Sequence, residues 1–167
     1  MSAYRFCPRC AAGLEARLLK AGEPERLVCS ACEYICYLDP KVAAGALVED
    51  VRGILLLRRG IEPAYGKWVF PGGFVDRGEH PETAAAREAL EEAGIVIDVR
   101  GLVGVYHAPA GSPVVLIVYR GSLVRGDPEA LDESLEARFF ARAEIPWDEL
   151  AFPTTRLAVR DYVQGNA

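Results

Sequence analysis

GFVDRGEHPETAAAREALEEAGI, residues 73–95, is the stretch of this chain that decides its fold. Its centre, Pro81–Ala93, is predicted to be a helix, because proline is favoured at a first helical position and Gly94 supplies a stop just past the end. At the start of the stretch, the pair Gly72 and Gly73 permits backbone conformations that bring a carbonyl or an amide close to a ligand. The junction between this glycine pair and the helix is therefore the first candidate site.

Three acids share one stripe of the predicted helix. At about 100° per residue, Glu88, Glu91 and Glu92 fall within an arc about 100° wide. Like charges three or four residues apart repel each other, and these acids lie beyond the first turn, where the helix dipole would stabilise them. Hard oxygen ligands clustered in this way suit Mg²⁺ or Mn²⁺. The alternative is a solvated helix face rich in glutamate. The opposite side, which is expected to face the core, carries Leu90, Ala86 and Ala93.

A basic residue lies beside the acids. Arg87 can pair with Glu79 or Glu88 and hold a carboxylate in one orientation. The whole stretch fits the pattern G-x5-E-x7-R-E-U-x-E-E-x-G-U, where U is aliphatic and Ala89 is the one soft match. The matching positions are Gly73, Glu79, Arg87, Glu88, Ala89, Glu91, Glu92, Gly94 and Ile95. The stretch resembles the Nudix box of the Nudix hydrolase superfamily, and an unrelated glutamate-rich helix would not explain its glycines and arginine.

This resemblance implies both a fold and a reaction. The fold is an α/β sandwich with a mixed sheet, the Nudix α/β/α arrangement. The reaction is the hydrolysis, with Mg²⁺ or Mn²⁺, of the pyrophosphate in a nucleoside diphosphate linked to another group. By the resemblance, Glu88 and Glu92 are the leading metal ligands, and Glu91 shares metal binding or helps to take the proton of a water. The carbonyl of Gly72 is a further metal ligand, and Arg87 orients a carboxylate.

Residues outside the box complete the candidate catalytic site. Glu133 or Glu136, in the acidic segment 132–136, could supply a remote ligand or base, and the alternative for this segment is a solvated loop. His80 and His107 are expected to be surface or capping residues rather than catalysts.

Substrate binding is predicted at Gly73, through its backbone, and at Phe74, whose ring could stack on a base. Trp68 and Tyr106 could also stack, although a tryptophan in a strand more often belongs to the core. The segment 105–114 follows the box as a loop between two predicted strands. It is the expected place for contacts to the group beyond the pyrophosphate.

Four of the five cysteines form a C-x2-C…C-x2-C pattern: Cys7, Cys10, Cys29 and Cys32. Two such turns complete a tetrahedron of thiolates around Zn²⁺. Arg5 and Arg9 would favour the thiolate form. A pair of disulfides or a redox dithiol is the alternative, which the lack of a visible secretion signal disfavours. Cys36, in the strand-like run 34–38, is expected to be a small apolar core residue.

The chain is expected to divide at the dipeptide 39–40. Residues 1–38 are predicted to form a zinc-ribbon module whose inner part, 14–27, is a hairpin or loop, and the metal would supply much of its folding energy. Residues 39–167 are predicted to form a Nudix hydrolase domain. Its expected elements are strands at 42–49, 53–58, 67–70, 95–106, 114–123 and 137–140, the helix described above, and a closing helix at 154–164.

The resemblance extends over nearly the whole chain. A four-cysteine ribbon, then 39–42, 66–74 and 145–153, is similar to the zinc-ribbon-bearing Nudix hydrolases. NADH pyrophosphatases show an S-Q-P-W-P-F-P-x-S array after the box, and 105–111 has no such array. Pro109 is similar to a position in ADP-ribose pyrophosphatases. ADP-ribose or FAD is therefore the expected substrate, with AMP released, and NADH is the alternative.

Composition limits the remaining classes of protein. Lys and Arg total 19 against 24 Asp and Glu, and a net charge of −5 disfavours a protein that coats nucleic acid. A regulator that senses a nucleotide without cutting it would lose box acids and carry a basic extension, and neither holds here. The uncharged run 101–119 contains two prolines and reads as two strands with a turn rather than a membrane span. We expect a cytoplasmic enzyme with a small dinucleotide-type substrate and no membrane or nucleic-acid partner, and a homodimer contact through the ribbon stays open.

Overall fold

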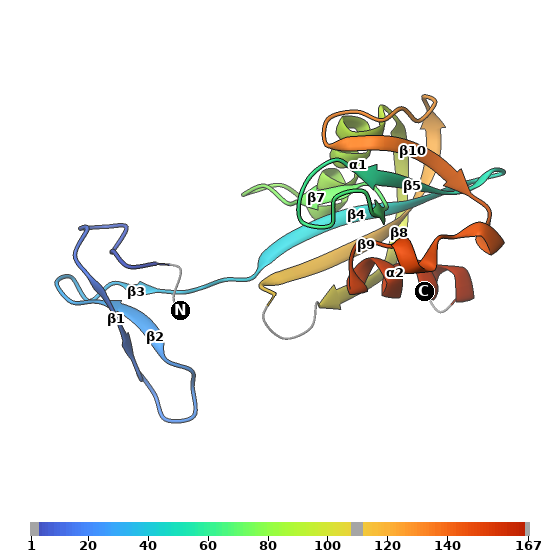
Figure 1. The fold of residues 1–167 in the computed structure, drawn as a ribbon. Helices are drawn as coiled ribbons and strands as arrows, with labels where there is room; N and C mark the ends of the chain where they lie inside the picture. The colour runs from blue at the N-terminus through green and yellow to red at the C-terminus, as the bar shows by residue number, and fades with distance from the viewer. Residues whose placement is uncertain (1–3, 108–111, 166–167) are drawn as a thin grey trace. The chain divides into compact units, whose positions relative to one another are not determined.

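The computed structural model describes residues 4–107 and 112–165. The chain forms two compact units that divide between Asp39 and Pro40 (Figure 1). No helix within the described residues has the length and apolar content needed to cross a membrane.

The first unit is a small antiparallel sheet, coloured blue in Figure 1. Its strands are β1 (Leu14–Arg17), β2 (Arg26–Cys29) and β3 (Ile35–Cys36), in the order β1-β2-β3. β1 and β2 form a hairpin over the stretch 14–27, and Gly22 in its turn has a φ of 86°. Cys36 lies in β3, opposite Leu27 of β2, so its predicted strand is confirmed, but it is half-buried and is not one of the buried core residues.

The second unit is built on one mixed sheet. Its strands are β4 (Lys41–Asp50), β5 (Gly53–Arg59), β6 (Trp68–Val69), β7 (Gly72–Phe74), β8 (Val96–His107), β9 (Val114–Arg125) and β10 (Ser134–Phe140). The order is β10-β5-β4-β9-β8, with β6 paired to β5 and β7 paired to β4. β4 and β9 are parallel, and the other pairs are antiparallel. The uncharged run 101–119 therefore contributes to the β8–β9 pair, as predicted.

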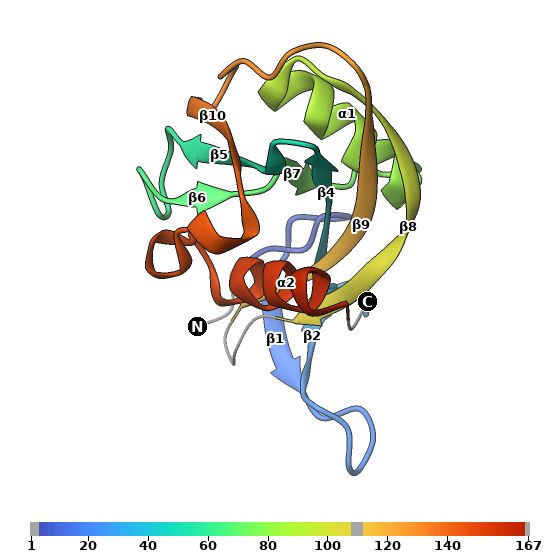
Figure 2. The same cartoon turned by 90° about the vertical axis from the view of Figure 1, so that its right-hand side faces the viewer.

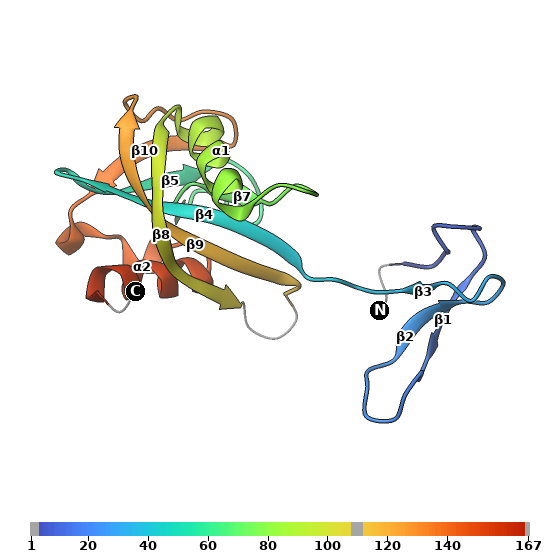
Figure 3. The same cartoon turned by 180° about the vertical axis from the view of Figure 1, so that it is seen from behind.

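Two helices cover the two faces of this sheet (Figures 1 and 3). α1 (Pro81–Ala93) packs on one face and α2 (Pro153–Gln164) on the other, and the short 3₁₀ turns η1 (Arg142–Glu144) and η2 (Trp147–Glu149) lead into α2. α1 begins with proline at its first turn and ends at Gly94, whose φ of 67° suits glycine. The predicted α/β/α sandwich and the bounds of α1 are confirmed.

The face of α1 that meets the sheet is made of alanines. Ala85, Ala89 and Ala93 are fully buried where α1 packs on β4 and β8, whereas Leu90 is 51% exposed. The prediction that Leu90 faces the core was wrong. Small side chains let the helix axis come close to the sheet, and a leucine at one of these positions would hold it away. As a result, the acids that flank the alanine face are brought down toward β7.

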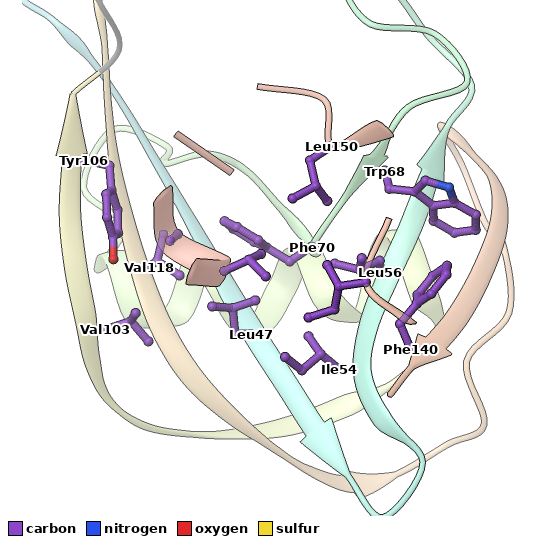
Figure 4. Packing of buried hydrophobic residues seen from close by; sticks show 13 residues of the cluster. Leu47, Ile54, Leu56, Trp68, Phe70, Val103, Tyr106, Val118, Phe140 and Leu150 are labelled. Atoms are coloured by element: carbon purple, nitrogen blue, oxygen red, sulfur yellow. The ribbon is translucent and has the colours of Figure 1, made fainter. Parts of the chain in front are cut away.

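The face under α2 holds the bulky core (Figure 4). Trp68 packs edge-on against Phe140, with ring centroids 4.8 Å apart at 79°, and is 6% exposed. Tyr106 is also buried in this cluster, and its hydroxyl donates to Oδ2 of Asp161 on α2 at 3.2 Å. Trp68 is thus a core residue, and neither ring is available to stack on a substrate base. Figure 2 shows the long, curved β8–β9 pair passing between the two helices.

Candidate active site and metal centre

Bare backbone at β7 allows the site to form. β7 pairs with β4 so closely that a Cβ on Gly72 would lie 2.7 Å from the Cα of Gly45. A Cβ on Gly73 would overlap the carboxylate of Glu88. Both glycines are therefore needed for steric reasons. A side chain at Gly72 would clash with the neighbouring strand, and one at Gly73 would clash with a box carboxylate.

Glu92 is anchored on this backbone. The N–H of Gly72 donates to Oε2 of Glu92 at 2.9 Å. The pKa of Glu92 is raised to about 7, chiefly because the side chain is buried; the N–H of Gly72 opposes this shift, and the charges of Glu88 and Glu133 add to it. Burial likewise raises the pKa of Glu88. Two carboxylates that are hard to ionise together mark a place where an added cation would be favoured.

Arg87 organises the other acids of the box. Its guanidinium donates to both carboxylate oxygens of Glu79 (2.9 and 3.0 Å), to Oε1 of Glu88 (2.8 Å) and to Oε2 of Glu91 (2.9 Å). It also donates to the carbonyl of Phe74 at 3.1 Å, which ties α1 to β7. The side chain of Glu88 is only 13% exposed, whereas that of Glu91 is 48% exposed. The sequence predicted an ion pair of Arg87 with Glu79 or Glu88, and in the structure Arg87 pairs with both.

The oxygen chemistry of these acids suits a hard divalent cation. The guanidinium of Arg87 bonds Glu79, Glu88 and Glu91 and lowers the pKa of Glu79 to about 2. Glu92 is held instead by the N–H of Gly72, so one arginine faces a surplus of carboxylates in the box. Carboxylate oxygens next to a backbone carbonyl are the ligands that Mg²⁺ and Mn²⁺ accept.

The remaining predicted residues have their own neighbours. Phe74 is 52% exposed, with Nζ of Lys41 4.9 Å from its ring centroid. Oε2 of Glu136 lies 3.9 Å from Nη1 of Arg58, whereas the charge of Glu133 acts on Glu92. His80 is the exposed N-cap residue of α1 and makes no side-chain cap.

Part of the predicted specificity segment is not described. His107 is exposed at the end of β8. Pro109, with residues 108–111, lies outside the described residues.

The four cysteines of the first unit converge on one point. The sulfur atoms of Cys7, Cys10, Cys29 and Cys32 lie within 4.8 Å of one another. Nearest neighbours are 3.4 Å (Cys10–Cys29), 3.5 Å (Cys10–Cys32) and 3.7 Å (Cys7–Cys32) apart. A disulfide would need about 2.05 Å. The corners of a tetrahedron with Zn–S bonds of about 2.3 Å lie near these separations, so the set fits Zn²⁺.

Backbone amides rather than arginines meet the sulfurs. The N–H groups of Cys32 and Ala31 point at Sγ of Cys29 at 3.4 Å and lower the pKa of Cys29 to about 6. The N–H of Arg9 donates to Sγ of Cys7 at 3.4 Å, while its guanidinium lies over the ring of Tyr34. Thiolate stabilisation therefore comes from the two turns themselves.

Gly73→Ala is expected to lower kcat at least about tenfold while the chain still folds. The added Cβ overlaps the carboxylate of Glu88, whose flexible end can move aside, so the cost falls on carboxylate placement rather than on packing. Steady-state kinetics and circular dichroism test this. Gly101→Ala, in β8, is the matched control because no atom lies within 4 Å of its added Cβ. Equal activity of the two variants would contradict the prediction.

Without added divalent cations, the free energy of unfolding of the second unit is expected to fall between about pH 4.5 and pH 7. The unfolded chain releases the proton of Glu92 near 4.5 and the native state near 7, so the native state binds more protons in this window. The loss is on the order of 1–3 kcal/mol. Urea unfolding followed by tryptophan fluorescence reports this unit, since both tryptophans, Trp68 and Trp147, lie in it. A Glu92→Gln variant that keeps the same pH slope would argue against the assignment.

Comparison with known proteins defines the class of this protein. A model of the NUDIX domain matches residues 39–161, and the Nudix N-terminal model, a zinc ribbon, matches residues 5–38. The chain belongs to the Nudix hydrolase family and is a pyrophosphohydrolase.

Three individual members of the family are similar to this chain over most of its length. The chain is 37% identical over 135 residues to an ADP-ribose pyrophosphatase of Methanocaldococcus jannaschii, covering 79% of this chain and 78% of that protein. It is 31% identical over 150 residues to the NAD-capped RNA hydrolase NudC of Stutzerimonas stutzeri, covering 87% of this chain but 51% of that protein. A NUDIX hydrolase structure from Nitrosomonas europaea matches with a TM-score of 0.89 and 35% identity, over 96% of this chain and 91% of that one.

Proposed function

We propose that this protein hydrolyses the pyrophosphate of ADP-ribose or FAD and releases AMP. The observation that carries the proposal is the pair Glu88 and Glu92, two desolvated carboxylates held against the bare backbone of Gly72 and Gly73. The similarity to the archaeal ADP-ribose pyrophosphatase supports ADP-ribose as the substrate. The choice of FAD rests on sequence resemblance alone.

Glu88, Glu91 and Glu92, with the carbonyl of Gly72, would hold Mg²⁺ or Mn²⁺. When bound, such ions neutralise phosphate charge and lower the pKa of a bound water. Arg87 keeps Glu88 and Glu91 oriented by one hydrogen bond to each. Glu91 is the most exposed of the three and is placed to share a ligand role or to accept the proton of the attacking water.

Of the two remote acids, Glu133 is the better candidate for a further ligand or base. Its charge acts on Glu92, and its carbonyl accepts a hydrogen bond from the N–H of Gly60 at 2.6 Å, which fixes this part of the segment beside the end of β5. The carboxylate of Glu136 instead faces Arg58.

One alternative substrate has specific support, and one alternative class of protein is disfavoured. NADH as the substrate is supported by the similarity to an NAD-capped RNA hydrolase, which extends over 87% of this chain. A nucleotide-sensing protein without catalysis is disfavoured by the complete set of box acids.

The test is to measure kcat/KM for ADP-ribose, FAD, NADH and dGTP at one Mg²⁺ concentration, with AMP followed as product. We expect ADP-ribose or FAD to exceed the others by at least about fivefold, since each contact to the group beyond the pyrophosphate is worth about 1–3 kcal/mol. NADH or dGTP as the best substrate by tenfold or more would reject the proposed specificity. No hydrolysis of any of the four would reject the function.

A further inference from the structure

The segment between β9 and β10 is bonded to the end of α1 that carries Glu92. The N–H of Leu131 donates to the carbonyl of Glu92 at 3.1 Å, and the N–H of Glu129 donates to the carbonyl of Ala93 at 3.1 Å. Figure 2 shows this segment, in orange, passing the end of α1. Carbonyls in the last turn of a helix have no partner within the helix, so the segment supplies donors for two of them. It is thus fixed to the main chain of a box acid.

A tight turn follows and leads into β10. The N–H of Ser134 donates to the carbonyl of Leu131 at 2.9 Å, which closes a turn over 131–134, and Ser134 begins the pairing of β10 with β5. Inside the turn, Asp132 has a φ of 43°. This left-handed conformation is open to Gly, Asn and Asp but strongly disfavoured for β-branched residues. The turn therefore carries Glu133 between α1 and β5.

Gly60, at the end of β5, holds Glu133 from the other side. The N–H of Gly60 donates to the carbonyl of Glu133 at 2.6 Å. A Cβ on Gly60 would lie 2.9 Å from that carbonyl oxygen and 3.3 Å from the carbonyl carbon. Both are backbone atoms, so they cannot swing aside as the end of a flexible side chain can. A side chain at Gly60 would therefore push the turn away from β5.

These bonds hold Glu133 near Glu92. Leu131, whose N–H is bonded to Glu92, precedes Glu133 by two residues, so the α-carbons of Leu131 and Glu133 lie within about 7 Å of each other. The charge of Glu133 reaches Glu92, whose pKa it helps to raise. The side chain of Glu133 is exposed, so its position depends on the backbone of the turn rather than on packing.

We propose that the turn 131–134 positions the carboxylate of Glu133 next to Glu92 for metal binding. Gly60 and Asp132 are its positioning residues. Both act through the backbone: Gly60 leaves room for the carbonyl of Glu133, and Asp132 adopts the left-handed conformation of the turn. The proposal rests on the proposed function, because it takes the box acids as the place where divalent cations bind.

The first test compares two substitutions of Asp132 by the dissociation constant of Mn²⁺, measured by calorimetry without substrate. Asp132→Gly and Asp132→Val remove the same carboxylate, but only glycine adopts a positive φ without strain. Asp132→Val is expected to bind Mn²⁺ about tenfold or more weakly than Asp132→Gly, since residues that support a metal site typically contribute about 10- to 100-fold. Equal affinities of the two variants would overturn the role of the turn.

The second test is a double-mutant cycle on Gly60 and Glu133, with the same Mn²⁺ measurement. Gly60→Ala and Glu133→Gln are each expected to weaken Mn²⁺ binding about tenfold. In the Glu133→Gln background, Gly60→Ala should have less than about a twofold effect, because the carboxylate that it positions is already gone. Additive effects, or native affinity in Glu133→Gln, would overturn the proposal. Gly101→Ala is the control and keeps native affinity, because no atom lies within 4 Å of its added Cβ.

Urea unfolding followed by tryptophan fluorescence shows which variants are folded. Where Asp132→Val does not fold, the cycle on Gly60 and Glu133 decides. Because Mn²⁺ binding is measured without substrate, the two proposals fail separately. The expected cycle in a protein that hydrolyses none of the four substrates would reject the proposed function alone. Hydrolysis of ADP-ribose together with an additive cycle would reject the positioning role alone.

Discussion

Glu92→Gln is expected to lower kcat for ADP-ribose by at least about 10²-fold. The substitution keeps the size of the side chain and removes one charged oxygen that would ligate the metal. Even groups that only support a metal ligand typically cost 10- to 100-fold, so a ligand itself should cost more. Glu88→Gln is expected to behave similarly, because the carboxylate of Glu88 lies against Gly73, as that of Glu92 lies against Gly72. Initial-rate kinetics at saturating Mg²⁺ measure the effect.

The folded state is expected to survive this change. At pH 7 the buried charge of Glu92 destabilises the native state, and a neutral glutamine removes this effect. The free energy of unfolding of the variant should therefore equal or exceed that of the native protein. Glu82→Gln is the control: Glu82 is exposed in the first turn of the same helix and lies 3.8 Å from His80. Native turnover in Glu92→Gln would reject the metal assignment.

Glu91→Gln distinguishes its two candidate roles. A loss comparable with that of Glu92→Gln would indicate that Glu91 takes the proton of the water. A clearly smaller loss would indicate a peripheral ligand, in keeping with its greater exposure.

The local parts of this site were predictable from sequence. Pro81 and Gly94 set the bounds of α1 through their own backbone preferences, which act within a few residues. The spacing of Glu88 and Glu92 on a helix follows from its geometry. The separation of the cysteines likewise predicted a cluster, because each C-x2-C turn is a local structure.

Other parts could not be predicted because they depend on packing between distant segments. Leu90 was expected in the core because it lies opposite the acids on the helix, but the alanine face of α1 is the one that packs on the sheet, chiefly on β4 and β8. Arg59 meets Phe152, which lies far along the chain, and no periodicity relates them. Tyr106 is an aromatic residue near the box in sequence, but α2 covers it, and its hydroxyl donates to Asp161.

Removal of Zn²⁺ is expected to unfold the first unit and to leave the second folded. Apart from two cluster cysteines, the buried hydrophobic residues described in the first unit are Leu27 and Val28, which is too small a core to hold three short strands. Metal binding in zinc-finger peptides is worth about 10–16 kcal/mol, and here it would be folding free energy. The purified protein should contain about one zinc per chain.

Hydrogen exchange after chelation, with Mg²⁺ then restored, tests this directly. Amides of β1 and β2 should lose protection, whereas those of β4 and β9 should keep theirs and hydrolysis should persist. Cys29→Ser should reproduce the loss without a chelator, because it removes the sulfur to which two backbone N–H groups donate. Cys36→Ser is the control, since Cys36 lies outside the cluster. Two disulfides by mass spectrometry with no bound zinc would contradict the assignment, as would a Cys29→Ser protein whose β1 and β2 amides stay protected.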